Sequence, residues 1–206
     1  MLFLQPLYNI LTNSPAGKIN HFALLKLIFY SLDKTIFYFL IFAFLRLCWL
    51  IFVRHRRSLK SEACVWIFAF YLILLLMLTT FRDTYFPWQW SLNLHRPLNE
   101  INLVFMKETL KLTKGASLLD FFYNSFGNIL WFMPFGFLFP IVIQKKRCFK
   151  LTVFLGFLLS FTIESFQFVL MTGVSDIDDI FFNVCGTILG YWLYYLIIKF
   201  HPRIIN

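Results

Sequence analysis

Apolar stretches about as long as a bilayer is thick recur along this 206-residue chain and constrain its fold more than any other feature. Each is close to the roughly 20 residues that an α-helix needs to cross the hydrocarbon core of a membrane. Because 60% of the residues are hydrophobic and only 14% are charged, the composition excludes an ordinary water-soluble domain. The sequence predicts an all-α, polytopic transmembrane helical bundle with about five spans. These spans cover residues 33–53, 63–81, 125–143, 151–171 and 180–198.

Basic residues gather in three short runs beside the apolar stretches, at residues 54–60, 144–147 and 199–203. Loops rich in Lys and Arg stay on the cytoplasmic side of a membrane. The runs follow the first, third and fifth spans, so they predict a multi-pass membrane protein with its N-terminus outside and its C-terminus cytoplasmic. They also account for the net charge of +9 through contact with anionic lipid, so membrane lipids are the expected partners and nucleic acid is not.

The N-terminal part of the chain is predicted to include a segment at the membrane surface. Residues 1–60 are expected to form an N-terminal extension with an interfacial segment and the first span, followed by a transmembrane domain at 61–200. Residues 22–32 fit either an interfacial helix or the start of a longer first span, which leaves the depth of residues 1–32 open.

The loop at residues 82–124 has nearly balanced charge, which suits the outer side. Trp88 and Trp90 are typical of an interfacial aromatic anchor. Leu103, Met106 and Leu110 have the spacing of an amphipathic helix on the membrane surface. We expect this outer loop helix to lie over the end of the bundle.

The four cysteines are far apart and lie in or beside apolar runs, so they offer neither a disulfide framework nor a CxxC metal site. No cofactor and no resident metal are predicted, and catalytic residues are not assigned.

Acidic and amide residues interrupt the apolar sequence between residues 164 and 190. Ionisable groups within a membrane are costly and usually have a function. The fourth span brings Glu164 and Gln167 onto one face, and the predicted topology brings the third and fifth spans to the same depth near the outer surface. The sequence therefore predicts an outward-facing ligand site. Its candidate residues are Glu164, Gln167, Asp176, Asp178, Asp179, Asn183 and Asn128.

Structural roles stay open for the same residues. One of the three aspartates is expected to cap the fifth helix, and capping does not explain all three. The amides can serve as interhelical hydrogen bonds instead of ligand contacts. A small-xxx-small pair at Gly186 and Gly190 predicts close helix packing, with Gly127 and Gly156 as further contact points.

Three segments in this order resemble the VanZ-like membrane proteins: residues 128–140, Glu164 with Gln167, and residues 176–191. The resemblance extends over residues from about 96 to 198 and marks 61–200 as a VanZ-like transmembrane domain. Residues 96–105 are similar to a looser form of another segment of the family, which adds Arg96 to the candidate ligand-binding residues.

The family is named for an accessory protein of glycopeptide-resistance gene clusters. The resemblance implies a bacterial membrane protein that lowers sensitivity to teicoplanin-type lipoglycopeptides, and it attaches no reaction to the chain.

Three mechanisms remain open. The leading one is binding or modification of an amphiphile at an outward-facing acidic pocket, with a lipid, a lipid-linked wall precursor or a lipoglycopeptide as ligand. The second is a metal-assisted enzyme acting on a lipid head group, in which residues 176–179 hold a divalent cation and Glu164 acts as general base. The third is a small proton-coupled transporter that uses Glu164. A homodimer formed through the glycine faces is a further candidate assembly.

Overall fold

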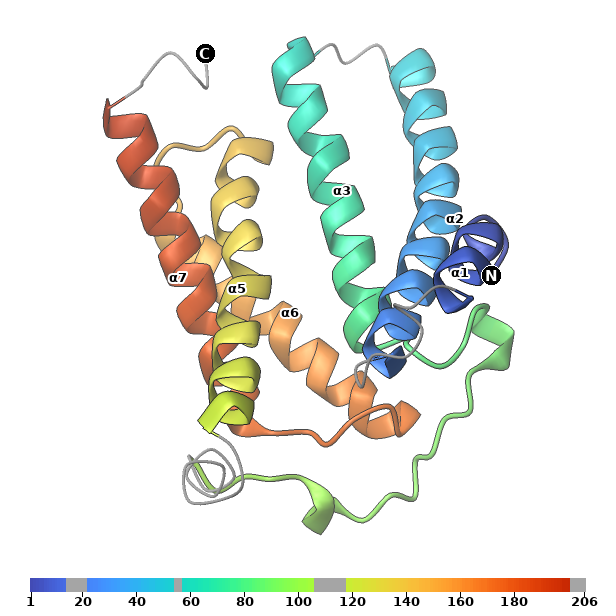
Figure 1. The fold of residues 1–206 in the computed structure, drawn as a ribbon. Helices are drawn as coiled ribbons and strands as arrows, with labels where there is room; N and C mark the ends of the chain where they lie inside the picture. The colour runs from blue at the N-terminus through green and yellow to red at the C-terminus, as the bar shows by residue number, and fades with distance from the viewer. Residues whose placement is uncertain (14–21, 54–56, 106–117, 201–206) are drawn as a thin grey trace. The chain divides into compact units, whose positions relative to one another are not determined.

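A computed structural model describes residues 1–13, 22–53, 57–105 and 118–200, with the side chains of 22–23 and 118–125 excepted. Within these ranges the chain is helical, with no β-strand, which confirms the predicted all-α class (Figure 1). The helices are α1 (Gln5–Thr12), α2 (Phe22–Val53), α3 (Leu59–Thr79), α5 (Leu118–Val142), α6 (Phe149–Leu170) and α7 (Ile177–Phe200). Two short 3-10 helices, η2 (Pro87–Gln89) and η3 (Leu98–Glu100), lie between α3 and α5.

Four helices, α2, α3, α6 and α7, are long and apolar enough to cross a membrane. The part of α5 whose side chains are described, Phe126–Val142, is a shorter apolar helix that continues through Pro134 and Pro140. These five helices correspond to the five predicted spans and are consistent with a helical membrane bundle.

The structure extends the first predicted span toward the N-terminus. Residues 22–32 continue into α2 as one uninterrupted helix. In the loop predicted to lie on the outer side, Leu103 lies outside a helix, and Met106 and Leu110 lie outside the described residues.

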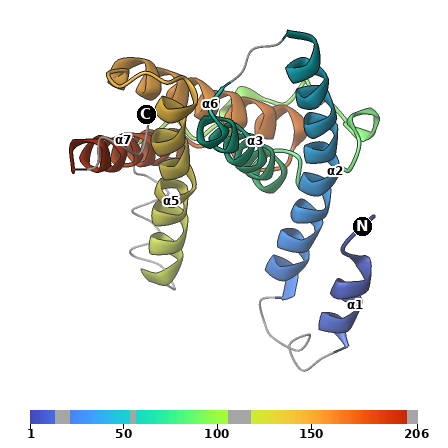
Figure 2. The same ribbon diagram turned by 90° about the horizontal axis from the view of Figure 1, so that it is seen from above.

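The chain divides into two compact units. The first comprises residues 1–57 and 69–90, and its buried side chains include Tyr71, Leu75 and Tyr85. In this unit α1 lies beside the first part of α2 (Figure 2).

The second unit comprises residues 58–68 and 91–206 and contains α5, α6 and α7. Its buried residues include Phe132, Phe135, Ile163 and Tyr194. This unit carries all of the candidate site residues.

Close packing of α7 on α5 depends on glycine. A Cβ added at Gly186 would collide with the Ile129 carbonyl, and one at Gly190 would collide with the Met133 carbonyl. Both predicted packing glycines therefore face α5 within the chain. Gly127, expected to be a further contact point, has no atom of the described residues within 4 Å of the place that a Cβ would take, so within the described part of the chain that expectation is wrong.

Candidate functional site

The candidate site is built where α6 ends and α7 begins. Helix α6 stops at Met171, a left-handed residue with φ 56° whose N–H bonds the Gln167 and Phe168 carbonyls. A short turn then leads into α7 at Ile177. This geometry brings the last turn of one helix beside the first turn of the next.

Glu164 and Asp176 are joined across this turn. The Asp176 backbone N–H donates to Glu164 Oε2 at 3.1 Å, and the Ser175 hydroxyl donates to the Glu164 carbonyl at 2.6 Å. The Glu164 side chain is only 5% exposed. A buried carboxylate is costly unless it is protonated or hydrogen-bonded, and the turn amide supplies one of its partners.

Asp176 also caps α7. Its Oδ1 accepts a hydrogen bond from the Asp178 N–H at 2.9 Å, two residues into the new helix, which is the geometry of an N-cap. The expectation that one of the three aspartates has a capping role thus falls on Asp176. Asp178 itself is buried on the first turn of α7.

Asp179 links α7 to α5. Asn128 Nδ2 donates to Asp179 Oδ1 at 2.6 Å. Helix α5, which corresponds to the third predicted span, therefore reaches the same end of the unit as Glu164 and Asp176, as the sequence predicted.

The other two candidates on α6 and α7 lie apart from this pairing. Asn183 is buried one turn further along α7, where its Nδ2 donates to Ser160 Oγ at 2.9 Å. Gln167 is buried beneath the turn, against Gly173. Gln167 thus lies against the turn, and Asn183 joins α7 to α6 through Ser160.

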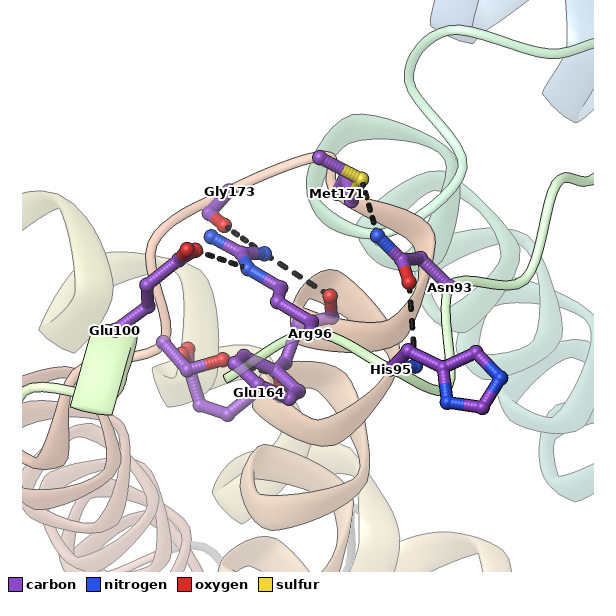
Figure 3. A network of polar contacts seen from close by, with 9 residues as sticks. Asn93, His95, Arg96, Glu100, Glu164, Met171 and Gly173 are labelled. Atoms are coloured by element: carbon purple, nitrogen blue, oxygen red, sulfur yellow. Dashed lines mark hydrogen bonds and ion pairs between the residues drawn. The ribbon is translucent and has the colours of Figure 1, made fainter. Parts of the chain in front are cut away.

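Arg96 ties the loop between α3 and α5 to the end of α6 (Figure 3). Its Nε pairs with Glu100 Oε2 at 2.6 Å, and its Nη1 donates to the carbonyls of Phe168 at 2.9 Å and Gly173 at 3.4 Å. The guanidinium also lies 4.7 Å from the centre of the Phe168 ring. Arg96 thus contacts the turn through backbone carbonyls.

Sequence reasoning missed Asn102, which holds the same loop against the start of α7. Its backbone pairs with Ser175 and Ile177, and its Nδ2 donates to Asp176 Oδ2 at 2.9 Å. Asn102 falls inside the family-like segment 96–105, where only Arg96 was singled out. Ser160 was also missed, although it precedes Glu164 by one helical turn.

We call Glu164, Asp176, Asp178 and Asp179 the acidic cluster. Among the described residues, the cationic side chain of Arg96 contacts the same turn. Among the residues that the structure describes, no three His, Cys, Asp or Glu side chains are placed to hold a metal ion.

The apolar helices and the acidic cluster at the end of α5, α6 and α7 define a helical membrane protein with carboxyl groups at the α6–α7 turn. The VanZ/LLP1 family model matches residues 68–198, more than half of the chain. The chain belongs to the VanZ-like family, which confirms the resemblance seen in its sequence. No curated protein and no solved structure matches the chain at a significant level.

Proposed function

We propose that this VanZ-type membrane protein binds or modifies an amphiphile of the bacterial cell envelope at the acidic cluster. The observation that carries the proposal is the meeting of Glu164, Asp176 and Asp179, from α6 and α7, beside a loop and a third helix that hydrogen-bond to them. Several carboxyl groups at one helix turn suit a ligand that offers positive charge or hydrogen-bond donors.

The surroundings of the cluster suit the apolar part of such a ligand. Large apolar side chains are exposed along the loop that contacts the cluster and on the α6–α7 turn: Leu92, Leu94, Leu98, Leu103, Val104, Met171 and Val174. Exposed apolar groups beside a polar site favour a molecule with a polar head and a hydrocarbon tail.

The candidate ligands are a lipid, a lipid-linked wall precursor or a lipoglycopeptide. Teicoplanin differs from vancomycin in carrying an acyl tail, which can place the drug at the bilayer surface. If the acidic cluster faces outward, as the basic runs predict, a tailed drug reaches it more readily than vancomycin does. The proposal therefore includes protection against teicoplanin-type drugs.

Growth inhibition tests this function. The wild type, Glu164→Gln and Asp179→Asn are expressed at matched membrane levels in a sensitive Gram-positive host, and teicoplanin and vancomycin are measured side by side. We expect the wild type to protect against teicoplanin only, and both variants to lose that protection because each removes a carboxylate from the cluster.

Asp83→Asn is the matched control, because Asp83 is an exposed carboxyl group in the other unit. It should protect as well as the wild type. Full protection by both cluster variants would contradict the proposed site, and equal protection against both drugs would contradict the role of the acyl tail.

A further inference from the structure

The first unit contains two buried ionisable neighbours, Asp33 and Lys34, within the apolar helix α2. Both residues are 0% exposed. Lys34 Nζ donates to the carbonyl of Phe81 and, at 3.2 Å each, to those of Arg82 and Thr84. Lys34 therefore satisfies carbonyl groups just beyond the end of α3.

Whereas Lys34 contacts the chain after the end of α3, Asp33 contacts the start of a different helix, α1. Its carboxylate accepts hydrogen bonds from the backbone N–H groups of Leu2, Phe3 and Leu4 at 2.6–2.7 Å. These amides lie at the start of α1, where no helical carbonyl is available to them. Asp33 thus attaches α1 to α2.

Tyr85 supports the Asp33 carboxylate. Its hydroxyl donates to Asp33 Oδ2 at 2.9 Å. Burial, and then this hydrogen bond, raise the pKa of the Tyr85 phenol above its ordinary value, so it stays protonated as a donor. We call Asp33, Lys34 and Tyr85 the polar node.

The lengths of α2 and α3 predict that the polar node lies where the hydrocarbon core ends. Helix α3 has 21 residues, and the carbonyls just past its last turn meet Lys34. The part of α2 beyond Lys34 is of similar length, and about 20 helical residues span the roughly 30 Å core.

An aromatic side chain marks the same depth. Trp88 follows Tyr85 closely, stacks on Phe86 with ring centres 4.6 Å apart, and is 78% exposed. Tryptophan is enriched at membrane–water interfaces because its ring is amphipathic. Helix length and aromatic content thus place the node at the membrane boundary independently.

Helix α1 has three distinct faces at this depth. Leu4, Tyr8 and Leu11 are partly buried, and the Tyr8 ring lies 6.1 Å from that of Phe29 on α2. The polar face carries Gln5 and Asn9, which are hydrogen-bonded at 2.9 Å. A further apolar face, with no counterpart in the described structure, exposes Leu7 and Ile10, and Phe3 is exposed just before the helix.

We propose that α1 lies in the boundary between head groups and acyl chains, with Phe3, Leu7 and Ile10 in contact with lipid, and that Asp33 holds it at that depth. The occupant of the exposed face is the lipid of the membrane that α2 and α3 cross. An apolar face opposite a polar face, on a helix without charged residues, fits this position.

Photo-crosslinking tests the lipid contact. A diazirine-bearing residue is placed at Ile10, and separately at Asn9 on the polar face, in the full chain in nanodiscs of phosphatidylglycerol and phosphatidylcholine. We expect a several-fold higher yield of lipid adduct at position 10. Equal yields at both positions, or adducts at position 10 formed mainly with protein, would overturn the proposal.

Two variants test the attachment. Asp33→Ala removes the acceptor of three α1 amides and should lower the lipid adduct at position 10 several-fold, toward the yield at position 9. Tyr85→Phe leaves those three hydrogen bonds in place and should leave the adduct unchanged. An unchanged yield in Asp33→Ala would overturn the role of Asp33, and the comparison of positions 10 and 9 decides the lipid contact even if that variant does not accumulate.

Discussion

At the residue scale, several candidate side chains take part in hydrogen bonds within the protein. Asp176 both caps α7 and accepts a hydrogen bond from Asn102, and Asp179 accepts one from Asn128. Carboxylates held in this way cost little rearrangement when a ligand arrives, which favours binding. The sequence identified the carboxyl groups, but it could not identify Asn102 as a partner, because that contact joins residues 74 positions apart.

The buried pair of Ser160 and Asn183 gives a residue-scale prediction. Asn183 Nδ2 donates to Ser160 Oγ, whereas the buried Asn183 Oδ1 accepts no hydrogen bond from the described residues. Ser160→Ala should lower the free energy of unfolding by about 1–3 kcal/mol, because it leaves the amide without that acceptor. The double variant Ser160→Ala/Asn183→Leu should lose less than the sum of the two single variants.

Denaturation in mixed detergent micelles measures this cycle. Thr162→Ala is the control, since the Thr162 hydroxyl is exposed and bonds the Leu158 carbonyl of its own helix. It should change stability little. Additive effects of Ser160→Ala and Asn183→Leu would show that the two side chains are not coupled.

At the element scale, hydropathy predicted the helices well and their partners poorly. The spans at residues 151–171 and 180–198 correspond closely to α6 and α7, because a membrane requires backbone groups to bond within a helix. The sequence left open whether the helix begins as early as Phe22, because Asp33 and Lys34 resemble the polar end of a span. Their partners come from α1 and from the chain after α3, which no local pattern indicates.

Helix contact gives the element-scale prediction. Gly190→Ala should destabilise the bundle by about 1–3 kcal/mol, the usual cost of overpacking, because the new Cβ meets the Met133 backbone. Gly127→Ala is the matched control and should be neutral or slightly stabilising, because nothing lies near that Cβ and alanine favours a helix. Thermal unfolding in detergent compares the two, and equal stability would contradict the close α5–α7 contact.

At the scale of the whole molecule, membership of the VanZ-like family and an all-helical membrane fold agree with the reading of the sequence. The net charge of +9 sits mainly in runs beside the spans, whereas the acidic cluster gathers at one turn of the second unit. Under the positive-inside rule this asymmetry predicts that the cluster faces outward. The ligand could not be predicted, since carboxyl groups specify charge and hydrogen bonding but not the remainder of a molecule.

Direct binding tests the central claim, that the acidic cluster engages an amphiphile. Purified protein in nanodiscs is titrated with teicoplanin and, separately, with vancomycin, and the heat of binding is compared for the wild type, Glu164→Gln and Asp83→Asn, with empty nanodiscs subtracted. The proposed role of the acidic cluster predicts saturable binding of teicoplanin that is weakened at least tenfold, about 1.4 kcal/mol, in Glu164→Gln and unchanged in Asp83→Asn. Teicoplanin binding of equal strength in all three proteins would contradict it, as would the absence of binding above that of empty nanodiscs.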